Sequence, residues 1–203
     1  MALWEIIKVG DPRLRKRARE VKQVTPEIRQ FIDDMFETMH AGNGVGLAAP
    51  QVGELVRIIV IELPADEEVE GSGKRYAVIN PEIVKMSRET VVANEGCLSV
   101  PGYVGEVERA EAVVVRGLDR RGKPIRIRAY DWLARVFQHE IDHCDGVLYI
   151  DRLTAPDRIW EVKPGDEEMA EAGQDVEIIG DKSPEGLSPD ETPVQPEVIE
   201  ATA

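Results

Sequence analysis

Cysteine is scarce in this sequence, since Cys97 and Cys144 are the only two among 203 residues. They could form one disulfide, but a chain of this length buries enough apolar surface to fold without a covalent staple. The scarcity excludes the class of small secreted domains that are held together by several disulfides. We therefore expect a reduced protein with a hydrophobic core of its own.

Long apolar stretches are also absent. Apolar runs such as residues 58–61 are far too short to cross a bilayer, which takes about 20 residues in a helix. Residues 1–10 show neither the apolar centre of a signal peptide nor the Arg- and Ser-rich pattern of a transit peptide. We expect a cytoplasmic protein without a membrane partner.

Basic residues are outnumbered, because 25 Lys and Arg stand against 39 Asp and Glu, a net charge of −14. Residues 163–203 hold 12 of the acidic and 2 of the basic residues, with five prolines and no aromatic residue. Such a composition cannot bury enough apolar surface to become ordered. We predict a folded domain over residues 1–162 and an acidic, proline-rich, mostly flexible tail over residues 163–203, in which residues 175–179 could form a short strand. The acidic tail repels phosphates, so we expect no direct binding of nucleic acid.

Hydrophobic spacing predicts an α+β fold, in which short antiparallel strands pack around a central helix. One helix is expected over residues 25–40, with Thr25 as its cap. A second helix is expected from Asp131, as its cap, to about His143. The strand candidates are short, β-branched and separated by turn residues: 55–63, 76–79, 82–86, 89–93, 112–118 and 123–129, the last two as a hairpin.

The second helix carries the strongest chemical signal, the run His139-Glu140-Ile141-Asp142-His143. Residues four apart lie on the same face of a helix, so both imidazoles can reach one metal ion. Glu140 is then close enough to contact a water molecule on that ion. Two incidental histidines on a solvated helix are the plainer interpretation. The chain has only three histidines, however, and two of them take this spacing around a glutamate.

A catalytic metal site usually has a third protein ligand and one open position. No histidine follows His143, although Glu161 and the acids of the tail remain available. The stronger candidate is Cys97, in the run Glu95-Gly96-Cys97-Leu98-Ser99 between a strand and a turn. A free cysteine is most often a small buried hydrophobe, and this second interpretation stays open for Cys97. It suits Cys144 better, because a residue next to His143 points about 100° away on a helix.

A glycine-rich loop covers residues 44–51, Gly-Val-Gly-Leu-Ala-Ala-Pro-Gln. It lacks the lysine and the hydroxyl of a phosphate-binding loop. Its small residues would let a substrate backbone come close, and Gln51 offers an amide donor for a developing oxyanion. A plain tight turn explains the loop equally well.

These three segments together resemble the peptide deformylase family. The family's GxGxAAxQ, EGCxS and HExDH motifs are matched in order by residues 44–51, 95–99 and 139–143. The similarity covers roughly residues 1–155. The resemblance implies a deformylase-like fold for the catalytic domain, residues 1–162. It also implies a hydrolase of protein biosynthesis and N-terminal processing, which removes the N-formyl group from the initiator methionine of new polypeptides.

The resemblance also implies the roles of the site residues. The metal ligands fall on Cys97, His139 and His143, and the metal is typically Fe²⁺, with Zn²⁺, Ni²⁺ or Co²⁺ as alternatives. Water activated by the metal attacks the formyl carbon, while Glu140 takes the proton and passes it to the leaving amine. The Gln51 side chain and the Leu98 N–H stabilise the oxyanion.

Recognition of methionine requires an apolar pocket near the metal. We expect substrate contacts at four residues: Val45, Gly46, Trp132 and Val136. Ordinary core packing explains these side chains equally well. A buried ion pair between Arg109 and Asp142, or between Arg109 and Glu95, could brace the site.

The acidic tail departs from the family pattern, because members of the ordinary bacterial type often end in a helix that is sometimes basic. This puts docking on the ribosome through such a helix in doubt. The expected partners are N-formylmethionyl nascent peptides, with transient proximity to the ribosome, and we expect a monomer. Two alternative functions stay open: an endopeptidase that uses the same helix, and a metal-binding protein without turnover. Intact Glu140 and Gln51 disfavour the latter.

Overall fold

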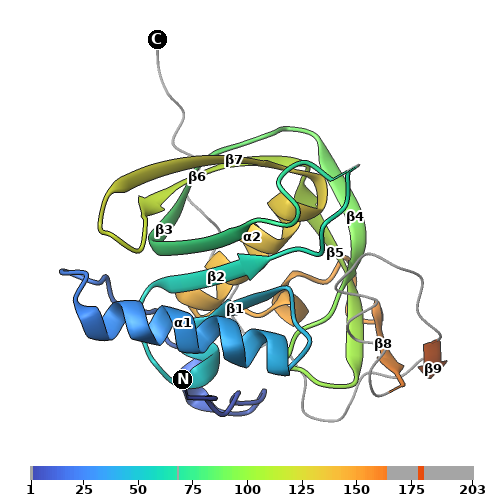
Figure 1. Cartoon of the computed structure of the whole chain (residues 1–203). Coiled ribbons are helices and arrows are strands. Elements are labelled where there is room, and N and C mark those ends of the chain that lie inside the picture. The colour runs from blue at the N-terminus through green and yellow to red at the C-terminus, as the bar shows by residue number, and fades with distance from the viewer. Residues whose placement is uncertain (1, 68, 164–177, 181–203) are drawn as a thin grey trace.

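The computed structural model describes residues 2–67, 69–163 and 178–180, and in these residues the chain forms two antiparallel sheets and two α-helices (Figure 1). Of the described strands, five form the first sheet, in the order β1 (Gly46–Ala48), β2 (Ile58–Glu62), β3 (Arg75–Met86), β6 (Ala112–Leu118) and β7 (Pro124–Tyr130). The other four form the second sheet, in the order β4 (Thr90–Glu95), β5 (Tyr103–Ala110), β8 (Ile159–Val162) and β9 (Ile178–Gly180).

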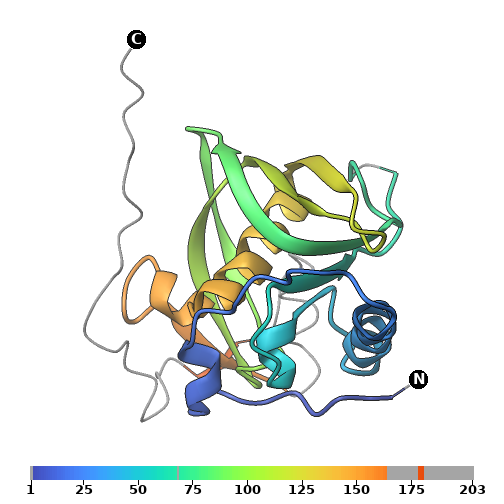
Figure 2. The ribbon, with the colours of Figure 1, turned by 90° about the vertical axis from the view of Figure 1, so that its left-hand side faces the viewer.

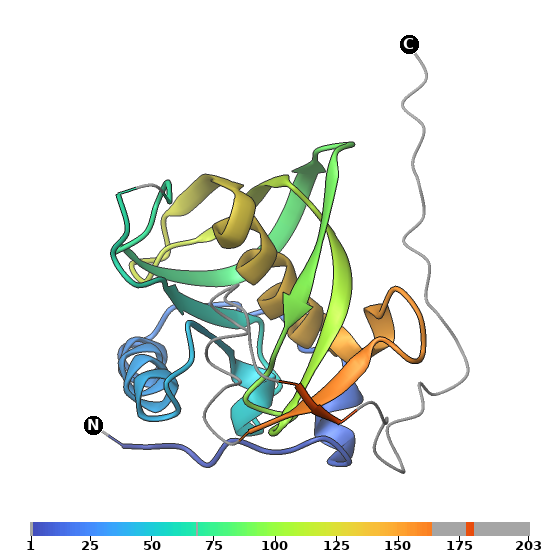
Figure 3. The same cartoon turned by 90° about the vertical axis from the view of Figure 1, so that its right-hand side faces the viewer.

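Helix α2 (Asp131–Asp145) lies in the middle of the molecule, between the first sheet and strands β4 and β5 (Figure 3). Its residues from Leu133 to Cys144 are all buried, because strands of both sheets cover it. It ends at Gly146, whose φ of 79° suits a residue without a side chain. The helix that carries the two histidines is therefore held from all sides, as the expected α+β arrangement requires.

Helix α1 (Pro26–Ala41) packs on the first sheet at β2, on the side away from α2 (Figure 2). Thr25 caps it through an N–H bond from Ile28 to the hydroxyl oxygen at 3.4 Å, which confirms the expected cap. Ile32, Met35 and Met39 recur at helical spacing and are fully buried. Three short 3-10 helices complete the described elements: η1 (Pro12–Arg15), η2 (Ala49–Val52) and η3 (Tyr149–Arg152).

The strand predictions hold for β2, β4, β6 and β7 within three residues at each end. Residues 76–79 and 82–86, expected as two strands, are one strand with a register shift between Ile79 and Glu82. The cause is Asn80, which takes a φ of 53°. Its side chain accepts from the Val21 N–H at 2.8 Å and donates to the Val21 carbonyl at 2.9 Å, so the strand bulges without ending.

The observed local structure differs from what the sequence predicts in two further ways. Asp131 does not cap α2, because Tyr130 holds that position and Asp131 is the first helical residue, with a φ of 49°. Strands β1, β5 and β8 were not expected from the sequence at all. In β5, a buried Arg109 interrupts the apolar pattern that marks a strand.

Most of the expected flexible tail lies outside the described residues. Of residues 163–203, only Lys163 and β9 are described, and β9 pairs with β8. Among the residues with a described structure, no helix is long and apolar enough to cross a membrane.

Candidate metal centre

Cys97, His139 and His143 meet at the end of β4 beside α2. One potential ligand atom from each lies within 4.8 Å of the others, and Cys97 Sγ is 3.3 Å from His143 Nε2. All three residues are buried, with 2%, 9% and 1% of their surface exposed. In the described part of the chain no other group of three side chains is arranged to hold a metal, so Glu161 is not the third ligand.

The backbone turn after β4 aims the Cys97 thiol at the histidines. The Val100 N–H donates to the Cys97 carbonyl at 2.8 Å and closes the turn. Two further donors face the sulfur, the Ser99 N–H at 3.4 Å and Gln51 Nε2 at 3.5 Å. Both groups are placed to donate to the sulfur, and a sulfur that binds a metal accepts such bonds.

The donor set fits a divalent transition metal. One sulfur and two imidazole nitrogens are three of the four ligands that tetrahedral sites use, which leaves one position for water or substrate. Soft sulfur with borderline nitrogen suits iron, zinc, nickel and cobalt, and does not suit magnesium or calcium. The ligand set therefore indicates a transition metal of this group but does not indicate which one.

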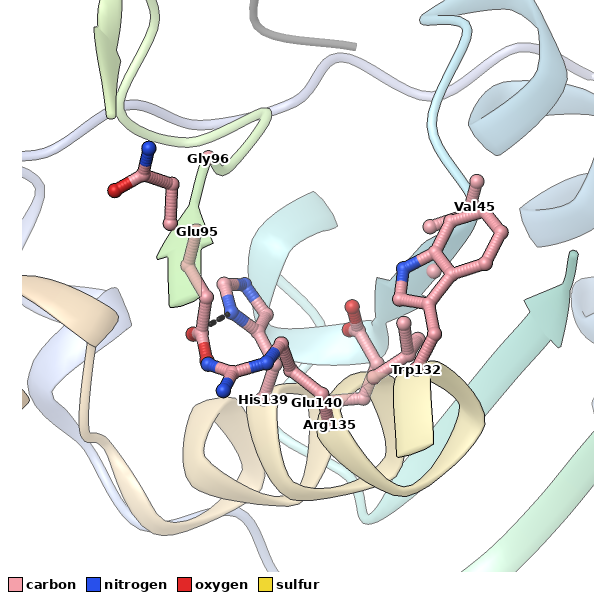
Figure 4. A pocket seen from close by; sticks show the side chains of 10 residues that line it. Val45, Glu95, Gly96, Trp132, Arg135, His139 and Glu140 are labelled. Carbon is pink, nitrogen blue, oxygen red and sulfur yellow. Dashed lines mark hydrogen bonds and ion pairs between the residues drawn. The ribbon is translucent and has the colours of Figure 1, made fainter. Parts of the chain in front are cut away.

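Glu95 fixes the orientation of the His139 ring (Figure 4). His139 Nδ1 lies 2.9 Å from Glu95 Oε2, and because a carboxylate only accepts, this nitrogen carries the proton. Nε2 is then the nitrogen that is left to bind a metal ion. Figure 4 shows the contact as a dashed line beside Arg135.

A buried network of charges holds Glu95 in turn. Arg109 donates to both Glu95 oxygens at 2.8 and 2.9 Å and to Asp142 at 2.5 Å, which confirms both of the expected ion pairs. Arg135 donates to Glu95 at 2.8 Å and to the carbonyls of Val107 and Val91 at 3.0 and 2.6 Å. These bonds join β4 and β5 to α2, and so join the cysteine to the histidines.

Arg135 and Arg152 are the members of this network that were not identified from the sequence. Arg152 donates to both oxygens of Asp142, at 2.5 and 2.7 Å. Arg135 stands four residues before His139, inside a run of buried helical residues. A charged residue one turn before a metal ligand, on a buried helix face, is the signal that could have identified it.

The site attracts positive charge. Burial raises the pKa of Glu95, but the charge and hydrogen bonds of Arg109 outweigh it and hold that pKa well below the ordinary value. Burial lowers the pKa of His139, but its bonds to Cys97 and Glu95, and their charges, raise it well above the ordinary value. The negative field that draws a proton to His139 also favours a divalent cation between the ligands.

His143 is neutral by the same physical reasoning. Burial lowers the pKa of His143 well below the ordinary value, and the charges of His139 and Arg109 lower it further. A neutral imidazole has the lone pair that a metal needs. Cys144, in contrast, packs in the core away from the cluster, and burial raises the pKa of its thiol to about 12. The interpretation of Cys144 as a small buried hydrophobe is thus confirmed.

Glu140 lies against the backbone of β1. A Cβ atom added at Gly46 would stand 2.3 Å from Glu140 Oε1, so the carboxylate occupies the space that a side chain would need. Gln51, on η2, accepts from the Ala48 N–H at 2.8 Å and donates to Ser99 Oγ at 3.3 Å. The amide nitrogen of Gln51 therefore faces the Cys97 turn, and both side chains are at most 3% exposed.

A small cavity of about 30 Å³ opens beside Glu140 and His139. Figure 4 shows Val45 and Trp132 on one side of it, Glu95 and Gly96 on the other, and Glu140 between. All four residues expected to contact substrate line it: Val45, Gly46, Trp132 and Val136. A larger cavity of about 440 Å³ adjoins it, and the two share Asn94, Trp132 and Arg135 as lining residues.

Comparison with known proteins gives consistent results. The sequence model of the polypeptide deformylase family matches residues 3–158. The peptide deformylase of Thermomicrobium roseum is 46% identical over 173 residues, which cover 85% of this chain and 98% of the relative. The crystal structure of peptide deformylase from Ehrlichia chaffeensis in complex with actinonin has a TM-score of 0.73 and 46% identity, covering 78% of this chain and 92% of that one.

A Met-Ala-Ser bound crystal structure of class I type b peptide deformylase from Acinetobacter baumannii is also similar. Its TM-score is 0.71 at 34% identity, and the match covers 75% of this chain and 99% of that one. These likenesses confirm the expected α+β fold.

Proposed function

This chain belongs to the polypeptide deformylase family, and on that premise we propose that it removes the N-formyl group from the initiator methionine of newly synthesised polypeptides. The observation that carries the proposal is the position of Glu140. Its buried carboxylate lines one cavity together with the metal-ligand candidate His139 and with the apolar side chains of Val45, Trp132 and Val136. A proton-transfer group, a metal centre and a pocket for an apolar side chain thus meet at one point.

Cys97, His139 and His143 would hold one divalent metal ion, for which we propose Fe²⁺, with Zn²⁺, Ni²⁺ or Co²⁺ as substitutes. Such an ion supplies a water of lowered pKa, about 7 in favourable sites, and polarises the formyl carbonyl. The remaining chemistry belongs to side chains and backbone groups of the chain.

Glu140 serves as the base and then as the acid. As a carboxylate it takes a proton from the attacking water, and as a carboxylic acid it gives that proton to the amine that leaves. Because Gly46 has no side chain, the Glu140 carboxylate is held against the β1 backbone with no side chain between it and the substrate. Formate and a free methionine amine are the products.

The Gln51 amide and the Leu98 N–H are the proposed donors to the oxyanion. Gln51 Nε2 already faces the Cys97 turn, and Leu98 is the next residue after Cys97. Preorganised donors of this kind contribute about 10²–10³-fold to the rate in other acyl-transfer enzymes.

The substrate fits as an extended chain between two sheet edges. Strand β1 is the edge of the first sheet and β4 is the edge of the second, and both border the cavity through Gly46 and through Asn94 and Glu95. An extended peptide can pair with such edges while the methionine side chain enters the pocket. The Acinetobacter baumannii relative was crystallised with Met-Ala-Ser, the peptide that remains after deformylation of formyl-Met-Ala-Ser.

One assay tests the proposal against both alternatives. Formate release and peptide cleavage are followed with formyl-Met-Ala-Ser, with Met-Ala-Ser, and with a longer peptide that carries no formyl group. We expect formate from the first substrate only, and Glu140→Gln should bind metal normally but release formate at least 100-fold more slowly. Internal cleavage of the long peptide would indicate an endopeptidase. Bound metal without any product would indicate a protein that has lost turnover.

A further inference from the structure

The extended segment before η1 contacts both parts of the chain that carry the proposed oxyanion donors. The Ile7 N–H donates to the Gln51 carbonyl at 2.8 Å, and the Val9 N–H donates to the Ser99 carbonyl at 2.7 Å. Figure 2 shows this segment passing η2 on its way to η1. Lys8 lies between these two backbone contacts, and its Nζ donates to the Leu98 carbonyl at 2.7 Å.

Lys8 and the metal-ligand sulfur hold opposite sides of one peptide group. The Leu98 carbonyl and the Ser99 N–H belong to the same trans peptide, so they point in opposite directions. The carbonyl accepts from Lys8, while the Ser99 N–H donates to Cys97 Sγ at 3.4 Å. An ammonium group on the carbonyl therefore limits the rotation of this peptide and polarises its N–H toward the sulfur.

We propose that Lys8 is a positioning residue of the active site, an inference that rests on the proposed function. Within the described residues Lys8 makes no hydrogen bond to the candidate metal ligands and does not line the cavity, so it acts through the Leu98–Ser99 peptide. By holding that peptide it keeps the neighbouring Leu98 N–H aimed at the oxyanion and the Ser99 N–H aimed at Cys97. Its side chain is exposed, so the contact is not needed for core packing.

Three variants separate this role from a general effect of charge. Lys8→Met keeps the length of the side chain and removes the donor, whereas Lys8→Arg keeps a cationic donor. Lys16→Met is the matched control, since Lys16 is also exposed, lies near Lys8 in sequence, and makes no side-chain hydrogen bond within the described residues. We expect the thermal unfolding midpoints of all three to match that of the wild type.

The kinetic result should be a selective loss of kcat. Losing one hydrogen bond that aligns an oxyanion donor should lower kcat for formyl-Met-Ala-Ser about fivefold in Lys8→Met. KM should stay within about twofold, because the methionine pocket is untouched. Lys8→Arg should recover most of the activity, and Lys16→Met should behave as the wild type. Unchanged kcat in Lys8→Met, or an equal loss in Lys16→Met, would overturn the proposal.

A second readout does not depend on turnover. In ¹⁵N-labelled protein the Ser99 amide proton should move toward the position of a weaker hydrogen bond in Lys8→Met, and should stay in place in Lys16→Met. An unmoved Ser99 resonance in Lys8→Met contradicts the positioning role, whatever the activity. If the wild-type chain releases no formate, the proposed function fails by itself, and the amide result still decides whether Lys8 controls this peptide.

Discussion

The replacement of Gly46 by alanine tests whether the position of one carboxylate controls the reaction. The added Cβ would stand 2.3 Å from Oε1, 2.8 Å from Cδ and 3.0 Å from Cγ of Glu140. Ordinary contacts begin at 3.4 Å, so the carboxylate has to retreat by about 1 Å. The obstacle is the end of a flexible side chain, and the φ of Gly46 is not in the left-handed region. The fold should therefore tolerate the change.

The expected effect is large on catalysis and small on stability. A displacement of about 1 Å in a reacting group can lower the rate about 100-fold, which corresponds to about 2.7 kcal/mol of transition-state stabilisation. The free energy of unfolding should change by less than about 1 kcal/mol, because an alanine also restricts the unfolded chain. Metal content should not change, since the added atom meets none of the three ligands.

The assay compares kcat for formyl-Met-Ala-Ser, metal content and thermal unfolding in Gly46→Ala and in a control, Gly117→Ala. In the control the new Cβ meets Val78 at 2.5 Å and the backbone oxygen of Ile79 at 2.8 Å, and no atom of Glu140 is among its nearest neighbours. It should lose stability and keep its kcat.

A double-mutant cycle identifies the cause of the expected loss. If Gly46→Ala acts only by moving Glu140, it should have no further effect in a Glu140→Ala background. A further 100-fold loss there, or wild-type kcat in the single variant, would refute the reasoning.

Four further predictions follow from other residues. Cys97→Ala should lose bound metal while Cys144→Ala keeps it, as measured by metal analysis of the purified proteins; equal metal contents would show that the ligand assignment is wrong. Trp132→Ala should join the two cavities. The ratio of kcat/KM for formyl-methionine substrates to kcat/KM for formylated residues with longer apolar side chains should then fall about tenfold. An unchanged ratio would show that other residues determine this selectivity. The Ala2 N–H and the Gln30 amide donate to Asp34 and hold its pKa below the ordinary value. The carboxylate therefore stabilises the fold above pH about 4, and this contribution is lost as the pH falls through the folded-state pKa. Denaturant titrations should show Asp34→Asn about 1 kcal/mol less stable than the wild type near pH 7 and equal to it near pH 2, and a difference that persists in acid would contradict the assignment. If the resident metal is iron, purification in air without reductant should lower activity and iron content together relative to anaerobic purification, because the thiolate ligand oxidises; equal iron and equal activity would argue against this.

The elements that the sequence predicts well are those whose apolar pattern is local. Helix α1 follows its spacing from Thr25 onward, and β6 has the expected bounds, because each packs one apolar face against the core. The strands that were missed are short or carry charges that tertiary contacts neutralise. Strand β5 contains Arg109, which is only 5% exposed because Glu95 and Asp142 pair with it. A pattern of hydrophobicity cannot show that a charged residue will be buried.

The candidate site was predictable in two parts for different reasons. His139, Glu140 and His143 follow from helical spacing, since one turn brings both imidazoles to the same face. Cys97 is 42 residues before His139 in the sequence, so no local spacing links the two; the lack of a histidine after His143 made Cys97 a candidate, and its resemblance to a known motif strengthened the link. Of the two arginines that bring them together, Arg109 was expected to pair with Asp142 or Glu95, whereas Arg135 was missed although it lies one helical turn before His139.

The buried charges explain why the candidate metal ligands can come from different layers of the fold. Glu95 precedes Cys97 by two residues at the end of β4, and it accepts from His139 on α2 while Arg109 and Arg135 pair with it. Removing these charges from water costs several kcal/mol per ion, which only a closed set of partners offsets. A small displacement of α2 against β4 would therefore leave an unpaired buried charge, so the network favours one relative position of the two. That position is the one in which Cys97 Sγ and both imidazoles come within 4.8 Å of one another, so the candidate metal site depends on the ion pairs.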